Sequence, residues 1–459
     1  MFKGAVLRYL LSDALSLIGN SIAGVVLPLV LLARTGDVLA AGSLALICAV
    51  PQFVCGVVGG AVLDRVNRRT VSVVADLISA ASCALLPMVD QVWGLSFGWF
   101  VALGLLGAAG DVPGMSARDA LLPSVCEREG ADLQRFVGAS QSLGALVNII
   151  GPAVAALLIG FMNDVDALWI TAAFSCAAAL VTLTLPRDVG EVSSSSANAD
   201  AVVAAASDAA PCNDAAPKKA GMLAAAKSVL VDGLSALFAT DALLRASTLL
   251  SFGITMVMGS LQGIVLPAYF TQLGQPQAVG YVVSAMGAGL LVGSTAYTAL
   301  AHVMSRRRWL VVSLLGMAVS VCMLGQFPAL PVLLAAAAVL GLLAGPASAL
   351  LGFFAFDRVP DDRRGSAMGT LNALYLVVAP AGAFVGSVLI SAAQIDGAGL
   401  VLTGAWVVVT ALALIAPPLR HLDDEVEAPL ADASSSTASD TAPGPATAAG
   451  GSMVDSTVR

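Results

Sequence analysis

Charge is scarce in this chain, and histidine is scarcer. Only 11% of its 459 residues are Asp, Glu, Lys or Arg, and only His302 and His421 are histidines. Because a soluble domain usually carries about 25% charged residues, an ordinary soluble globule is excluded. No His-centred constellation for catalysis or metal binding is present, so we expect neither an enzyme, nor a metal site, nor a cofactor.

The seven cysteines do not predict a disulfide framework. Most of them lie within apolar runs, where a free thiol behaves as a small hydrophobe, and no His or Asp stands near Cys48 and Cys55 to complete a metal set. The sequence also lacks a G-x-x-x-x-G-K-[ST] phosphate loop, which would bind ATP phosphates. A pump driven directly by ATP is therefore disfavoured.

The chain is rich in apolar residues. Its residues are 58% hydrophobic, and its mean hydropathy is +0.90. About 20 apolar residues span a bilayer as a helix, and twelve stretches approach or exceed that length: 9–33, 40–63, 70–89, 93–115, 136–160, 165–186, 246–271, 278–303, 309–327, 330–355, 365–392 and 397–417. The sequence therefore predicts an all-α integral membrane protein with twelve transmembrane helices.

Basic residues collect on one side of these predicted spans. If both termini and the even-numbered connections share a side, only Arg34 of the 22 basic residues falls in a connection on the other side. Connections rich in Lys and Arg stay in the cytoplasm. We therefore expect a multi-pass protein of the cell membrane with both termini cytoplasmic.

The chain also repeats itself. Five pairs of segments match in the same order: Leu7-Arg8 with Leu244-Arg245, Gly24–Pro28 with Gly263–Pro267, Gly42 with Gly280, Asn67–Arg69 with Ser305–Arg307, and Gly151–Ala153 with Ala379–Ala381. This order predicts two pseudo-symmetric six-helix halves. Between them, residues 188–220 are too polar to fold alone, whereas 222–238 fit a short interfacial helix. We expect an N-terminal half over 1–187, a cytoplasmic linker over 188–240, a C-terminal half over 241–418 and a disordered cytoplasmic tail over 419–459.

Four charges within six residues interrupt the apolar sequence at Asp64, Arg65, Arg68 and Arg69. Such a segment cannot sit in hydrocarbon, so it marks a tight turn at the membrane surface. The spacing G-x-x-x-D-R-x-x-R-R, which begins at Gly60, resembles the loop between helices 2 and 3 of the major facilitator superfamily, a family of secondary transporters. The drug-efflux and secretion-effector branch, with its macrolide and siderophore exporters, is similar in further segments: Leu121–Pro123, Gly151–Ala153, Asp232–Leu234, Leu243–Arg245 and Pro360 with Arg363–Gly365.

The resemblance implies a role for the turn motif, defined as Gly60, Asp64, Arg65, Arg68 and Arg69. In the family this motif is a latch that stabilises the outward-facing state. Arg65 and Arg69 would pair with acidic groups across the two halves. The alternative is a solvated basic turn that only sets orientation. Asn67 stands where the family prefers glycine, and asparagine tolerates the left-handed backbone of such a turn.

Three carboxylates fall inside the predicted spans: Asp13, Asp76 and Asp111. A charge at the bilayer centre costs at least about 2.5–3.5 kcal/mol, so each carboxylate needs a reason. Each could reach water or a turn arginine at the cytoplasmic end, or could bind and release a coupling proton. Asp76 is the first candidate for the proton and Asp111 the second. The Arg-x-x-x-Gly signature of many drug/proton antiporters is missing, because the run 93–115 contains no arginine.

Neutral polar residues on the predicted spans are candidates for a substrate cavity: Asn20, Gln52, Gln141, Asn148, Gln262, Asn372 and Tyr375. With Phe and Met around them, they suit a largely apolar, weakly polar ligand better than a sugar or an ion. The sequence indicates no buried Lys or Arg that would meet an anionic substrate. Taken alone, each of these residues is more often a polar contact between helices than a ligand contact.

These features predict a secondary active transporter that exports amphipathic small molecules, drugs or secreted metabolites, by alternating access coupled to proton influx. We expect a monomer in the lipid bilayer with no nucleic-acid partner. Two alternatives stay open. One is a transporter of the same fold that imports or flips lipid-like solutes, and the other is a membrane sensor or scaffold that does not transport.

Overall fold

The computed structural model describes residues 4–63, 66–130, 132–162, 165–190, 230–239, 241–359 and 364–420. Asp64 and Arg65 of the turn motif, residues 191–229 of the predicted linker and the tail from residue 421 lie outside these ranges. The described residues form helices and short connections, without a strand.

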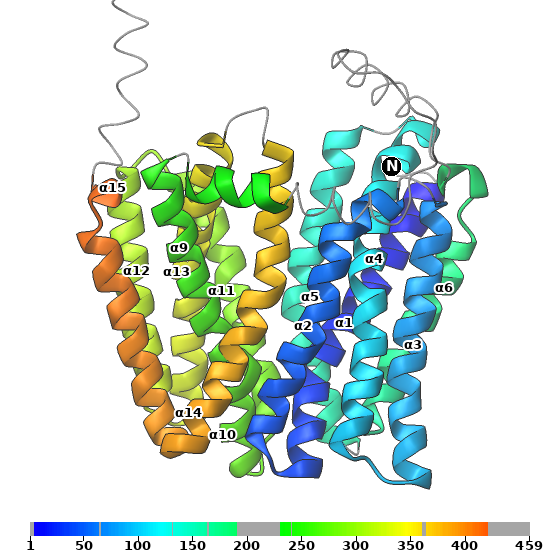
Figure 1. Cartoon of the computed structure of the whole chain (residues 1–459), viewed down its shortest axis with the longest axis horizontal. Helices are drawn as coiled ribbons and strands as arrows, with labels where there is room; N and C mark the ends of the chain where they lie inside the picture. The colour runs from blue at the N-terminus through cyan, green and yellow to red at the C-terminus, as the bar shows by residue number, and fades with distance from the viewer. Residues whose placement is uncertain are drawn as a thin grey trace, which may run out of the picture.

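The helices run antiparallel to their neighbours along the chain (Figure 1). Their bounds are α1 (Gly4–Thr35), α2 (Val38–Leu63), α3 (Arg68–Val92), α4 (Phe97–Glu129), α5 (Leu133–Phe161), α6 (Ala167–Leu183), η1 (Arg187–Gly190), α9 (Ala242–Ser260), η2 (Leu261–Val265), α10 (Leu266–Gln272), α11 (Ala278–Leu300), α12 (Arg306–Gly325), α13 (Leu330–Asp357), α14 (Arg364–Ile415) and α15 (Pro417–Arg420).

These helices make up twelve membrane spans. Ten helices of the described part are long and apolar enough to cross a membrane, with α9, η2 and α10 forming one of them. The helix α6 is apolar but shorter. The helix α14 comprises two spans, because its backbone leaves the helical region at Gln394, where φ is 60° and ψ is 179°. The predicted all-α membrane fold with twelve spans is confirmed.

The spans form two groups that stand side by side (Figure 1). Helices α1–α6 make one group, and the spans from α9 to α14 make the other. The first described residues and α15 lie at the same end of the bundle (Figure 1), as an even number of spans requires. We call this end the terminal end and the opposite one the far end. Residues 230–238 are helical at the terminal end, and Ala236 and Leu237 among them are fully buried.

Polar residues at the membrane surface begin several of the spans. The Asn67 side chain accepts a hydrogen bond from the Thr70 amide and so caps α3. Asp132 caps α5, Asp241 caps α9 and Ser305 caps α12 in the same manner. The first amide groups of a helix have no partner within the helix, so such caps stabilise its start.

The seventh span contains one π-helical turn, η2, between α9 and α10. The matching segment of the first half, Gly24–Pro28, lies inside α1 and stays α-helical. A π-turn inserts a residue into a helix and re-aims the side chains around it. The two halves therefore differ at a segment that lines the space between them.

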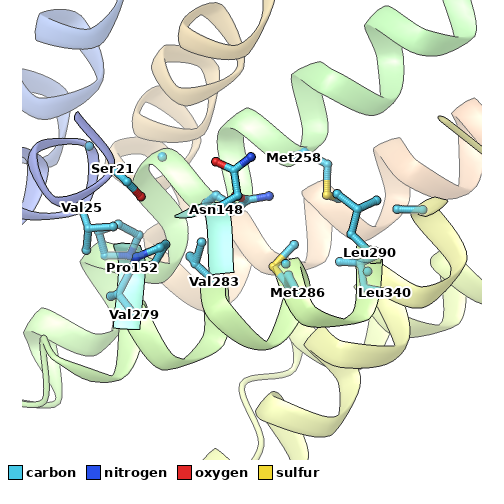
Figure 2. A pocket seen from close by; sticks show the side chains of 17 residues that line it. Ser21, Val25, Asn148, Pro152, Met258, Val279, Val283, Met286, Leu290 and Leu340 are labelled. Atoms are coloured by element: carbon cyan, nitrogen blue, oxygen red, sulfur yellow. The ribbon is translucent and has the colours of Figure 1, made fainter. Parts of the chain in front are cut away.

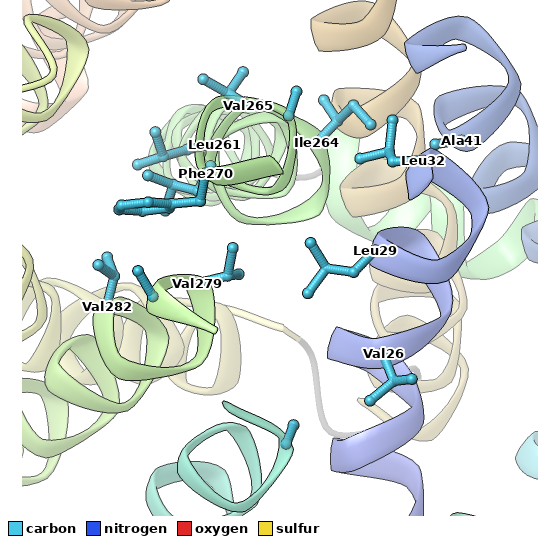
Figure 3. Close-up of a cluster of buried hydrophobic side chains, with 14 of the residues drawn as sticks. Val26, Leu29, Leu32, Ala41, Leu261, Ile264, Val265, Phe270, Val279 and Val282 are labelled. Carbon is cyan, nitrogen blue, oxygen red and sulfur yellow. The ribbon is translucent and has the colours of Figure 1, made fainter. Parts of the chain in front are cut away.

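The halves pack directly against each other at the far end. Figure 3 shows Leu29 and Leu32 of α1 pointing toward Val279 and Ile264 of the other half, within one cluster of buried apolar side chains. Nearer the terminal end the two groups of helices stand farther apart in the view of Figure 1. The halves are thus in contact at the far end and diverge toward the terminal end.

Candidate functional site

One cavity, here called the central cavity, lies between the two halves. Its volume is about 540 Å³, within the roughly 300–1,000 Å³ typical of sites for drug-sized ligands. Its walls come from α1 and α5 of one half and from α9, η2, α10, α11 and α13 of the other. Only the folded arrangement of both halves creates this space.

The wall of the central cavity is apolar with a few neutral polar groups. Ser21, Asn148 and Gln262 supply the polar side chains, and none of the lining residues is charged. Figure 2 shows Asn148 between Ser21 and Met258 in that view, with Met286 nearby. Methionine side chains are flexible and polarisable, so they adapt to ligands of different shape. This cavity suits amphipathic molecules without a required charge.

Two smaller spaces lie within the halves. The N-chamber, about 220 Å³, is enclosed by α1, α2, α3 and α4, and the C-chamber, about 470 Å³, by α9, α11, α12, α13 and α14. The seven predicted cavity residues divide among these spaces: Asn148 and Gln262 line the central cavity, Asn20 and Gln52 the N-chamber, and Asn372 and Tyr375 the C-chamber, while Gln141 is exposed on α5 and lines none of the three. Sequence reasoning missed Ser21, because serine is common in spans.

Asp76 is held by an arginine deep within the N-terminal half. The guanidinium of Arg118 on α4 donates to both carboxylate oxygens of Asp76 on α3, and the two side chains are 6% and 5% exposed. The Ser16 hydroxyl on α1 donates to the same carboxylate at 3.0 Å. One buried ion pair thereby ties three helices together.

The position of Arg118 corrects an expectation from the sequence. The predicted spans 93–115 and 136–160 leave Arg118 in the connection between them. In the structure α4 continues to Glu129, so Arg118 lies inside a helix and is buried. The apolar run in this region ends near Met115, whereas the helix continues for several more turns. Polar turns of a helix stay stable where neighbouring helices pack against them.

The other two predicted carboxylates have neutral hydrogen-bond partners. Asp13 on α1 is 8% exposed, and the Ser140 hydroxyl on α5 donates to it at 3.3 Å. Asp111 on α4 accepts a hydrogen bond of 2.7 Å from the Ser79 hydroxyl. Arg118 is close enough to interact electrostatically with both carboxylates. Asp13, Asp76 and Asp111 therefore all interact with the same buried guanidinium.

The described arginines of the turn motif bind inside their own half. Arg69 donates from Nε to the Thr182 carbonyl and from its terminal nitrogen to the Leu183 carbonyl, at the end of α6. Arg68 donates to the Ala120 carbonyl on α4. In this conformation Arg69 is bound within its own half, because the last carbonyls of a helix lack partners in the helix and attract the guanidinium. Its pairing across the halves in the outward-facing state stays a prediction.

The fold and the cavity together define a class of protein. Two six-helix halves with a substrate-sized cavity at their interface are the architecture of a secondary transporter. The model of the family described as the Major Facilitator Superfamily matches residues 9–259 and 248–449. The chain belongs to this superfamily.

Drug-efflux proteins are among its relatives in sequence. The multidrug efflux pump Tap of Mycolicibacterium fortuitum is 26% identical over 425 residues, which cover 92% of this chain and 98% of that protein. Macrolide efflux protein A of Streptococcus pyogenes is 30% identical over 181 residues, which cover 38% of this chain and 43% of that protein. The expected resemblance to the drug-efflux branch is confirmed.

Solved structures share the fold at low sequence identity. The nucleoside transporter NupG aligns with a TM-score of 0.65 at 16% identity, covering 89% of this chain and 98% of that one. A transporter of the POT family aligns with a TM-score of 0.64 at 11% identity, covering 90% and 96%. These likenesses concern the fold.

Proposed function

We propose that this transporter exports amphipathic small molecules, drugs or secreted metabolites, by alternating access driven by proton influx. The observation that carries the proposal is the central cavity, whose wall is apolar, uncharged and dotted with neutral polar groups such as Asn148 and Gln262. The efflux pump Tap, similar over nearly its whole length, supports the direction of transport. We propose that the protein works as a monomer in the bilayer and has no enzymatic activity.

We further propose a division into halves over 1–187 and 241–418, joined by a cytoplasmic linker over 188–240 and followed by a cytoplasmic tail over 419–459. The distribution of basic residues supports cytoplasmic termini. With that orientation the terminal end faces the cytoplasm, and the present conformation receives substrate from inside the cell.

The orientation predicts the accessibility of Cys212, which lies in the linker outside the described residues. With the other cysteines replaced, an impermeant maleimide should leave Cys212 unlabelled in intact cells and label it after permeabilisation. Gln275, exposed in the connection between α10 and α11, is the matched control, since Gln275→Cys should be labelled in intact cells. Labelling of Cys212 in intact cells would show that the linker lies outside the cell, and the proposed orientation would be wrong.

Proton coupling is proposed for the network around Arg118. A proton on Asp76 competes with the guanidinium, so proton loading and opening of the ion pair become one event. Arg118 Nε is buried without a hydrogen-bond partner among the described residues, which leaves the guanidinium capacity for a second acceptor. Asp13 lies within its electrostatic reach and is bonded to α5 of the half interface through Ser140.

Replacing Asp76 with asparagine should separate accumulation from exchange. Inside-out vesicles with an imposed pH gradient should accumulate a transported dye or antibiotic, chosen from a panel of lipophilic compounds. One proton moving down about 100 mV supplies about 2.3 kcal/mol, enough for a roughly fifty-fold gradient. Asp76→Asn should lose this accumulation and keep exchange at equal pH. If the variant pumps as well as the parent, the coupling carboxylate lies elsewhere, and Asp111 is tested next.

The same vesicles test export itself. If they accumulate no compound of the panel, the proposed export is contradicted.

The turn motif of Gly60, Asp64, Arg65, Arg68 and Arg69 is proposed as a latch between conformations. Asp64→Asn should lower transport by about tenfold at equal membrane abundance, because a coupling of about 1–3 kcal/mol between states is lost. Asp132→Asn is the control, since asparagine caps α5 as well as aspartate does. An undiminished rate for Asp64→Asn would reduce the motif to a signal for orientation.

A further inference from the structure

The starts of α3 and α12 match in the sequence repeat, but their arginines have different partners. Both helices begin after a polar N-cap. In the N-terminal half, Arg68 and Arg69 donate to backbone carbonyls of α4 and of the end of α6. In the C-terminal half, the Cζ atom of Arg306 lies 4.5 Å from the centroid of the Phe353 ring. The same sequence pattern therefore turns inward in one half only.

Two arginines in the first turn of α12 have no acidic partner among the described residues. Arg306 and the exposed Arg308 form no salt bridge within the described ranges. Five other arginines do form one: Arg34, Arg118, Arg128, Arg135 and Arg358. The start of a helix is also the positive end of its dipole, which disfavours cations there. An anion bound from outside would offset both effects.

The exposed face of α12 continues from Arg308 as an apolar stripe. Exposed apolar side chains follow at helical spacing, namely those of Val312, Leu315, Val319 and Met323. The helix packs against α13 and α14 at the edge of the bundle (Figure 1), so the stripe contacts the hydrocarbon of the bilayer. Arg308 therefore lies at the level of the lipid headgroups, where anionic lipids attract basic residues.

A groove between α12 and α13 lies deeper in the membrane on the same face. Its volume is about 510 Å³, and apolar and small side chains line it, Val319 and Met323 of the stripe among them. On α12 the groove begins at Gly316, eight residues after Arg308, which is about 12 Å along a helix. Half of the hydrocarbon core of a bilayer is about 15 Å thick. An acyl chain that starts at the level of Arg308 therefore reaches the groove.

We propose that this face of the C-terminal half binds an anionic phospholipid. The phosphate lies at Arg306 and Arg308, because guanidinium groups donate charge-assisted hydrogen bonds to phosphate oxygens. One acyl chain follows the stripe of α12 to the groove. A free phosphate ion would leave the stripe and the groove uncovered, which favours the lipid. This lipid site is separate from the central cavity, so its failure would leave the proposed export untouched.

Two reporters at equal depth test the lipid site on the full-length protein in nanodiscs. Val312→Cys reports the stripe on α12, and Val74→Cys on α3 is the match. Each position lies six residues after the first residue of its helix, and Val312 and Val74 are 47% and 48% exposed. In chains whose other cysteines are replaced, each cysteine carries a bimane fluorophore. Spin-labelled phosphatidylglycerol and phosphatidylcholine with identical chains serve as quenchers.

The anionic lipid should gather at the α12 reporter. The ratio of quenching by phosphatidylglycerol to quenching by phosphatidylcholine should be about fivefold higher at residue 312 than at residue 74. Arg306→Gln combined with Arg308→Gln should lower the ratio at residue 312 to that at residue 74. Arg135→Gln is the control, since the Arg135 side chain is 83% exposed at the start of α5, and it should leave the ratio at the parent value.

Melting temperatures report whether each variant is folded, and Arg308→Gln alone decides the question if the double variant fails to fold. Equal ratios at the two reporters, or a raised ratio that survives the loss of both arginines, would overturn the proposal. Quenching of residue 312 by neither lipid would also overturn it, since another protein copy would then cover this face. Replacing chloride with inorganic phosphate at constant ionic strength should leave the ratio unchanged. A ratio lost in phosphate would identify a site for the free ion and contradict the lipid site.

Discussion

Replacing Arg118 with leucine should lower the free energy of unfolding by about 3–5 kcal/mol, because it leaves a carboxylate buried without its counter-charge. Asp76 is 5% exposed in its side chain, so water cannot compensate for the loss. The single remaining Ser16 hydroxyl bond offsets only part of it. Denaturation of the purified protein in detergent micelles measures this change.

Two further variants separate the ion pair from a general effect of losing arginine. Arg135→Leu is the surface control, since the Arg135 side chain is 83% exposed and, within the described ranges, forms a salt bridge with Asp132, the N-cap of the same helix. It should change stability by at most about 1 kcal/mol. The double variant Asp76→Asn with Arg118→Leu should be more stable than Arg118→Leu alone, because no charge remains unpaired. A parent-like stability of Arg118→Leu would contradict a structural ion pair.

Gly280→Leu should prevent closure of the far end and lower transport by about tenfold or more. A Cβ at residue 280 on α11 would lie 2.6 Å from the Ala156 Cβ and still closer to the Pro152 carbonyl on α5. Backbone atoms cannot rotate away, so α5 and α11 must separate. Overpacking of this kind costs about 1–3 kcal/mol, and each 1.4 kcal/mol changes a population tenfold. Uptake into inside-out vesicles measures the loss.

Accessibility distinguishes a blocked closure from a misfolded chain. Val283 lines the central cavity, so a Val283→Cys reporter should react with an impermeant reagent from outside the cell far more readily when Gly280→Leu is present. Gly160→Leu on α5, where nothing lies within 4 Å of the missing Cβ, should leave the reporter and the transport rate unchanged. Parent-like labelling in Gly280→Leu would show that the far end still closes.

Gly42 shows that the sequence repeat marks a contact between the two halves. It matches Gly280 in the repeat, and a Cβ there would meet Ser387 and Ala383 on α14. Each half thus places one glycine where the other half's helix approaches. Sequence comparison recognises the pair by order alone, whereas the reason for both glycines is the contact between the halves. Gly42→Leu should therefore reproduce the effect of Gly280→Leu.

The three carboxylates show the limit of sequence reasoning about the site. Sequence alone identifies Asp13, Asp76 and Asp111 as costly residues in apolar runs. It does not indicate that Arg118, 42 residues after Asp76, faces the same point, because rotation of two helices about their axes depends on their packing. Arg118 also follows the apolar run, so a hydropathy pattern ends the span before reaching it.

The sequence by itself determined the class of this protein, its twelve spans and its two halves. Hydropathy, basic residues and repeats are patterns along the chain, and they can be recognised without knowing how the helices pack. Tertiary structure alone decided which polar residues share a space. Asn148 and Gln262, more than 100 residues apart, meet in the central cavity, whereas Asn20 and Gln52 join Asp111 in the N-chamber. The physical reason is that a cavity is where helices fail to touch, and that depends on side-chain volumes from several helices at once.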